Sequence, residues 1–163
     1  MRLTTFLTTT LSALAFAAAA QAAEVNVTIG PRLQDQASQY GQRDLDYLAD
    51  ELRESVQQAL ERSGTLADAG TTIDLVIEDA TPNRPTFRQM AMKPGLSYES
   101  FGIGGAQISG VLTTPDGRQV PLGYRWYETD IRWAQVAGTW SDAENTFDRF
   151  ARKLVNGDAV AER

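Results

Sequence analysis

The chain contains four segments in which apolar and polar residues alternate, a pattern typical of half-buried β-strands. These segments are residues 24–29, 72–79, 104–114 and 119–130. A Thr-Pro-Asp-Gly sequence at 114–117 separates the last two, and it favours a turn because proline presets the first turn dihedral and glycine tolerates a positive φ. We therefore predict four strands, of which the last two form a hairpin.

Two further segments have apolar residues at helical spacing. Residues 43–63 and 141–154 each place an apolar stripe along one side, as expected of helices that pack on a core. Ser141, with Glu144 three positions later, matches the capping-box pattern and predicts that the serine caps the second helix. Residues 32–42 are polar and follow neither period, so we expect a loop there.

The predicted order of elements is β-α-β-β-β-α, which indicates an α+β fold. We expect a two-layer sandwich with both helices on one face of a mostly antiparallel four-stranded sheet. Because a helix separates the first two strands, these strands are able to pair in parallel. The sequence shows no repeat or linker, so we expect one domain over residues 23–157 and a frayed tail at residues 158–163.

The N-terminal segment has the features of a cleavable export signal. Arg2 precedes an alanine-rich apolar stretch at residues 7–20, and an Ala-Gln-Ala tripeptide suited to signal peptidase ends at Ala22. Threonines interrupt the apolar stretch, which argues against a membrane span. We predict a signal peptide at residues 1–22. The chain has no cysteine, which leaves no residue for a lipid anchor and favours a bacterial periplasm as the destination.

The composition narrows the chemistry that the chain is able to perform. It has neither histidine nor cysteine, so Ser-His-Asp triads, thiol nucleophiles and zinc sites built on these ligands are absent. This disfavours an enzyme, and we predict no metal and no cofactor. The net charge is −6, without a basic stripe along the sequence, which disfavours nucleic acid and anionic membranes as partners.

The segment between the second and third strands is the region where we expect function. Residues 80–102 show no clear period, and a connection of this length inside a compact domain is commonly functional. The alternative is that its Asn and Arg side chains hydrogen-bond the loop to the sheet. Together with one tryptophan from a later loop, the candidate binding residues are Asn83, Arg84, Phe87, Arg88, Tyr98 and Trp133.

Two other patterns were weighed as sites of chemistry. Glu128 and Asp130 follow the last strand and are the candidate acid–base pair of a carboxylate-dependent hydrolase acting on envelope glycans. The Gly-Ile-Gly-Gly sequence at 102–105 opens a strand rather than a helix, so it does not match a nucleotide-binding loop. We interpret these glycines as positions of close backbone approach.

Several local sequences resemble an uncharacterised family of exported proteobacterial proteins. The resemblance extends over residues 73–154 and rests on the sequences at 79–86, 100–106, 126–128 and 139–143. It implies an exported envelope protein and supplies no activity, cofactor or catalytic residue. Our first hypothesis is therefore a periplasmic, non-enzymatic binding or accessory domain whose partner is an envelope protein or glycan, and the glycan hydrolase is the alternative.

Overall fold

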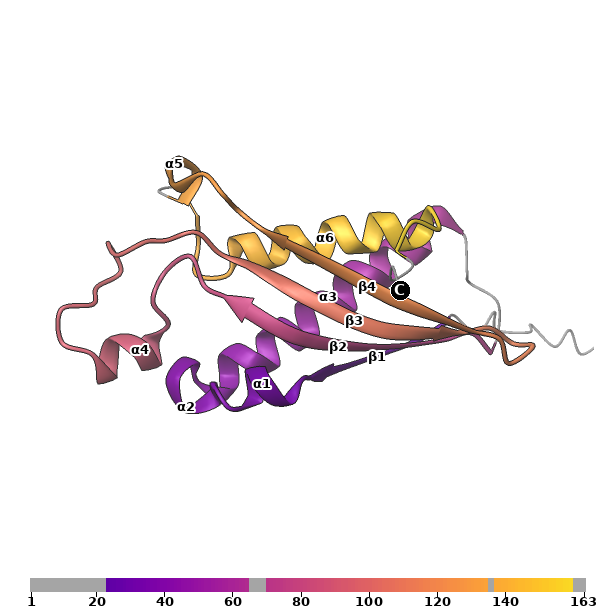
Figure 1. Ribbon diagram of the computed structural model, residues 1–163, viewed down its shortest axis with the longest axis horizontal. Coiled ribbons are helices and arrows are strands. Elements are labelled where there is room, and N and C mark those ends of the chain that lie inside the picture. Colours follow the sequence, from indigo (N-terminus) through magenta and orange to yellow (C-terminus); the bar gives the residue numbers. More distant parts are fainter. Residues whose placement is uncertain (1–22, 65–69, 135–136, 160–163) are drawn as a thin grey trace, which may run out of the picture.

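The computed structural model describes residues 23–64, 70–134 and 137–159. The predicted signal peptide at 1–22 lies outside this part, as do residues 160–163 of the predicted tail. The described chain folds into a four-stranded sheet with two long helices on one of its faces (Figure 1). The predicted α+β class and the order of the main elements, β-α-β-β-β-α, are confirmed.

The four strands follow one another across the sheet in the order β1-β2-β3-β4. The first pair is parallel because the helix α3 (Gln42–Ser63) carries the chain back between the two strands, and the other two pairs are antiparallel. The predicted hairpin is therefore present. The strands are β1 (Glu24–Ile29), β2 (Thr72–Thr81), β3 (Gly105–Thr113) and β4 (Gln119–Tyr127).

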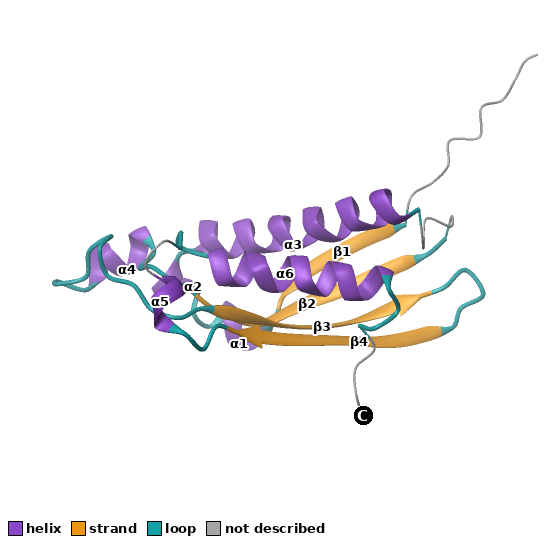
Figure 2. Ribbon diagram, turned by 90° about the horizontal axis from the view of Figure 1, so that it is seen from above, coloured by secondary structure: helices purple, strands orange, loops and turns teal. Residues whose placement is uncertain are grey.

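The helical layer consists of α3 (Gln42–Ser63) and α6 (Ser141–Val155), which lie side by side over the sheet (Figure 2). The two helices bury the apolar stripes that their spacing predicts. Gly64 ends α3 in the left-handed conformation that suits glycine. Fully buried core side chains include Leu45, Leu48, Leu52 and Val56 of α3, Phe147 and Phe150 of α6, and Ile73, Leu75 and Ile77 of β2.

The prediction of a loop at residues 32–42 is wrong. This segment forms two one-turn helices, α1 (Pro31–Gln34) and α2 (Ala37–Tyr40), which lead into α3. Leu33 is fully buried and Tyr40 nearly so, and the Tyr40 ring meets the Trp140 ring edge-on. Two isolated apolar residues are too few to show a period, although they are enough to hold the segment against the core.

The C-terminal residues that the structure describes pack against the domain. Ala159 is buried, and its carbonyl accepts a hydrogen bond of 3.1 Å from the Gly123 N–H at the outer edge of β4. The first residues of the tail that we predicted to be frayed are therefore in contact with the sheet. No helix in the described part of the chain is long and apolar enough to cross a membrane.

The two ends of the sheet differ in what they carry. At one end, which we call the basal end, lie residue 23 and the hairpin turn at 114–118. At the opposite, distal end lie the connections 82–104 and 128–140, which contain α4 (Phe87–Met92) and α5 (Ile131–Ala134). Figure 1 shows both short helices beyond the same end of the sheet.

Candidate functional site

The distal end gathers the exposed apolar side chains of the molecule. Among the described residues, eight large hydrophobic side chains are exposed, and only Tyr47 on α3 lies elsewhere. Phe87 is 82% exposed and Trp133 is 66% exposed. Large exposed apolar patches on folded domains are commonly contact sites. We call the set the distal apolar surface: Phe87, Met92, Tyr98, Phe101, Ile103, Ile131 and Trp133.

A capping box at the start of α4 positions Phe87. The Gln89 N–H donates to the Thr86 hydroxyl at 3.2 Å, and the Thr86 N–H donates to the Gln89 side-chain oxygen at 3.0 Å. These bonds satisfy two backbone donors that a helix start leaves free. Thr86 itself is buried, so the helix begins at a fixed point and presents Phe87 outward.

Asn83 is buried, with 1% of its surface exposed, and it joins β2 to the start of α6. Its side-chain oxygen accepts a hydrogen bond of 2.9 Å from the Asp142 N–H, and its amide donates to the Asp142 carboxylate. The Gly104 N–H donates to the same carboxylate at 2.9 Å. Asn83 therefore has a structural role, but it holds the distal connections to the start of α6 and not to the sheet, where the alternative expected these bonds.

The predicted capping box at Ser141 is wrong because α6 already begins at that residue. Trp140 occupies the N-cap position of α6 and makes no capping hydrogen bond through its side chain. The Glu144 N–H, from which the Ser141 hydroxyl would have accepted a hydrogen bond in a capping box, donates to the Trp140 carbonyl at 2.9 Å instead. The Ser141 hydroxyl accepts a hydrogen bond of 2.7 Å from the Gly138 N–H outside the helix.

Arg84 ties the two distal connections together. Its Nε donates to the Ala137 carbonyl and its Nη1 to the Tyr98 carbonyl, both at 2.6 Å. The guanidinium carbon also lies 5.7 Å from the centre of the Tyr98 ring, within range of a cation–π contact. The planar guanidinium is thus able to bridge two carbonyls while supporting an aromatic ring at the surface.

Arg88 is an exposed member of the predicted set that also makes a backbone contact. Its Nε donates to the Ser38 carbonyl at 3.2 Å, which links α4 to α2. The six candidate residues therefore separate into two groups. Asn83, Arg84 and Arg88 bind the loops to the domain, whereas Phe87, Tyr98 and Trp133 present side chains to the outside.

The glycines at 104 and 105 are positions of close backbone approach. A Cβ atom at Gly104 would lie 2.6 Å from the Thr81 carbonyl oxygen, and one at Gly105 would lie 2.3 Å from that of Trp126. Both distances are too short for any side chain. The glycines therefore allow the distal connection to enter β3 against its two neighbouring strands.

The candidate acid–base pair lies in the connection between β4 and α5. The Glu128 carboxylate accepts hydrogen bonds from the N–H groups of Thr129, at 2.7 Å, and Asp130, at 3.0 Å. The Asp130 carboxylate accepts hydrogen bonds from the guanidinium and from the backbone N–H of Arg132. These two contacts hold the pKa of Asp130 below its usual range, and the contact with the guanidinium has the larger effect. A general acid requires a raised pKa, so Asp130 is not suited to that role in this conformation.

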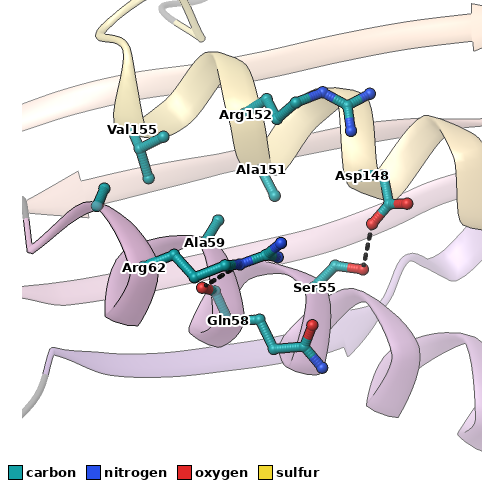
Figure 3. A pocket seen from close by; sticks show the side chains of 9 residues that line it. Ser55, Gln58, Ala59, Arg62, Asp148, Ala151, Arg152 and Val155 are labelled. Carbon is teal, nitrogen blue, oxygen red and sulfur yellow. Dashed lines mark hydrogen bonds between the residues drawn. The ribbon is translucent and has the colours of Figure 1, made fainter.

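A groove of about 420 Å³ lies between α3 and α6 (Figure 3). Its floor contains small side chains such as Ala59 and Ala151, and Arg62 and Arg152 come from opposite sides. Both arginines lie near helix C-termini, where a positive charge interacts favourably with the helix dipole. The groove contains a single carboxylate, that of Asp148, which accepts a hydrogen bond from Ser55.

The last strand places its two neighbouring aromatic residues on opposite faces of the sheet. Trp126 is half-buried beneath α6, with the Arg149 guanidinium 4.3 Å from its ring centre. On the uncovered face, the Tyr127 hydroxyl donates to Asp79 at 2.9 Å. Burial, followed by the nearby Asp79, raises the pKa of Tyr127, so this phenol stays protonated at neutral pH.

No protein-family model and no curated protein matches the chain. Among solved structures, one described as a "putative lipoprotein" from Caulobacter crescentus CB15 is 16% identical and has a TM-score of 0.40, with 84% of this chain and 87% of that chain covered. A minor lipoprotein from Acinetobacter baumannii is 10% identical with a TM-score of 0.34, covering 83% of this chain and 91% of its own. Within the described residues, no group of three or more acidic side chains is placed to hold a metal ion.

Proposed function

We propose that the chain is an exported periplasmic protein that works as a non-enzymatic docking domain and contacts an envelope partner through its distal apolar surface. The observation that carries this proposal is the position of seven large apolar side chains at one end of the molecule. They are not needed for the core, which is already filled by residues of the helices and strands.

The rigidity of the distal end supports a binding role. Asn83, Arg84 and the Thr86–Gln89 capping box fix the connections that carry the apolar side chains. A surface that is held in place before binding loses less conformational entropy when it meets its partner. Loops attached firmly to a scaffold in this way are common positions for binding residues.

The periplasmic location that we propose is supported by features of the sequence. The first 22 residues have the pattern of a cleavable export signal, and the absence of cysteine suits a periplasmic protein that folds without disulfides. The structure satisfies its buried polar side chains internally, since no buried side-chain nitrogen or oxygen in the described residues lacks a hydrogen-bond partner. Core packing and hydrogen bonds therefore hold the domain together without a disulfide bond.

In-cell photocrosslinking tests the docking role. A photoreactive phenylalanine analogue is placed at Phe87 or Trp133 in the distal end, and at Gln119, which is also exposed, in the basal half as a control. We expect adducts, either protein bands on gels or lipid additions in intact mass, from the two distal positions and not from the control. Equal yields from all three positions, or none from any, would contradict the proposal.

A further inference from the structure

Resting on the proposed function, we infer that the partner of the distal apolar surface is a phospholipid bilayer with anionic headgroups. The first observation is the pairing of apolar and basic residues on the projecting turns. Each turn of α4 and α5 that exposes an apolar side chain has a basic residue next to it in the sequence. The pairs are Phe87 with Arg88, Met92 with Lys93, and Ile131 and Trp133 with Arg132 between them. Arg132 is ion-paired with Asp130 and Arg88 donates one hydrogen bond to the Ser38 carbonyl, whereas Lys93 makes no ion pair among the described residues.

This arrangement matches the two layers of a membrane surface. Apolar and aromatic side chains enter the boundary between headgroups and acyl chains, while neighbouring Lys and Arg side chains reach anionic headgroups. Trp and Tyr are especially favoured at this depth because their rings are apolar and carry one polar group. Trp133 and Tyr98 are both more than half exposed.

The local charge differs from the charge of the whole molecule. The chain has a net charge of −6, but the two distal connections, 82–104 and 128–140, together contain four basic residues and three acidic residues, a net charge of +1. The basic residues come from two separate segments, so they form no continuous stripe in the sequence. Folding nevertheless places them at the end that carries the apolar side chains, and this local excess complements an anionic surface.

The shape of the distal end favours a bilayer over a protein partner. Four of its seven apolar residues belong to two separate short helices, α4 and α5, which Figures 1 and 2 show apart from each other, and the other three lie in the connection after α4. The hollow beneath the loop measures about 220 Å³ and is lined largely by the residues that fix the loop, such as Asn83 and Arg84. It is too small to receive a helix or strand of another protein, whereas a fluid bilayer adapts to separate projections.

Vesicle co-sedimentation tests this inference with the exported protein, expressed as the full chain, purified after export and checked at its N-terminus by mass spectrometry. The probes are vesicles of phosphatidylethanolamine with phosphatidylglycerol, and vesicles of phosphatidylcholine alone. The double variant Phe87→Ser/Trp133→Ser removes the two most exposed apolar side chains. Tyr47→Ser is the control, because it removes an exposed aromatic side chain that belongs to α3 and not to the distal connections.

We expect the wild-type protein and Tyr47→Ser to bind the anionic vesicles. The affinity of the double variant should be lower by about tenfold or more. Lys93→Gln should weaken binding to the anionic vesicles by about fivefold and leave binding to phosphatidylcholine unchanged. The fluorescence of Trp133 should shift to shorter wavelength on binding, a change that Trp133→Phe removes without loss of binding. Circular dichroism confirms that each variant is folded.

The bilayer inference is overturned if the wild-type protein binds neither type of vesicle. It is also overturned if the double variant binds the anionic vesicles as tightly as the wild-type protein. If protein crosslinks from positions 87 and 133 persist in that case, the docking role stands and the partner is a protein. If those crosslinks are also absent, the docking role fails as well.

Discussion

The chain reverses its direction at both ends of the sheet, but through connections of different length and composition. At the basal end, residues 114–118 reverse it with a tight turn in which the Gly117 N–H donates to the Thr114 carbonyl at 2.8 Å. At the distal end, 82–104 and 128–140 make far longer connections. The basal turn exposes no large apolar side chain, whereas the distal connections expose seven.

This difference indicates that the distal connections contain more residues than are needed to join the elements on either side. A short turn is enough to join two antiparallel strands. The additional residues fall into a buried or hydrogen-bonded group, represented by Asn83 and Arg84, and an outward group, represented by Phe87 and Trp133. The two groups should respond to mutation in opposite ways, with loss of stability for the first and loss of binding for the second.

The largest effect on stability is expected for Asn83→Ala. The change leaves the Asp142 N–H without its partner and removes one donor from the buried Asp142 carboxylate, so the free energy of unfolding should fall by about 3 kcal/mol. Chemical denaturation measures this. Asn145→Ala, on the exposed side of α6, is the control and should change stability by less than about 0.5 kcal/mol. Similar values for both variants would show that Asn83 is not part of the scaffold.

A smaller, local effect is expected for Arg84→Lys. A lysine ammonium is unable to bridge the Ala137 and Tyr98 carbonyls with the geometry of a guanidinium, so about 1 kcal/mol of stability should be lost. Hydrogen exchange should become faster in residues 93–103 while the exchange of β2 stays unchanged. Faster exchange throughout the sheet would mean that Arg84 supports the whole fold and not the distal connections alone.

Removal of the outward side chains should leave stability almost unchanged. Phe87→Ser/Trp133→Ser changes residues that are largely exposed, so the free energy of unfolding should shift by less than about 0.5 kcal/mol. The same variant should lose the adducts and the vesicle binding described above. A large loss of stability in thermal unfolding would place these side chains with the scaffold and remove the distinction between the two groups.

The smallest effect on stability is expected for a change at Glu51, which belongs to α3 in the helical layer and not to either end of the sheet. Burial, followed by the charges of Glu144, Glu54 and Asp148, raises the pKa of Glu51. Its protonated form is therefore favoured in the folded state, and the stability that this group contributes is present at acidic pH and lost as pH rises through the raised pKa.

Glu51→Gln should consequently stabilise the domain at pH 7 by about 0.3 kcal/mol, the size of a like-charge pair on a helix. The gain should disappear below the usual pKa range of a carboxyl group. Thermal unfolding at both pH values measures the difference, and a gain that grows towards acidic pH would show that the sign is reversed.

Much of the fold was predictable because its main elements carry local signals. The alternation in the strands, the Thr-Pro-Asp-Gly turn and the apolar stripes of α3 and α6 placed these elements within a few residues of their observed bounds. Leu33 and Tyr40, by contrast, anchor α1 and α2 with one buried residue each, which is too little to form a pattern.

The candidate site was predictable in its position and less so in its roles. Residues 80–102 stood out through length and irregularity, but the burial of Asn83 depends on Asp142, which lies far away in the sequence and gives no local signal. The sequence does contain a local signal for α4. Thr86 and Gln89 have the spacing of a capping box, which predicts the start of this helix at Phe87.

The contribution of α6 to the core has a consequence for how the protein is made. Phe147 and Phe150 are fully buried, and Asp142 receives the contacts from Asn83. Synthesis and export both proceed from the N-terminus, so the strands emerge before the helix that covers β3 and β4. The apolar face of the sheet therefore stays partly uncovered until the last segment emerges, and a chain that stops before residue 141 should be insoluble.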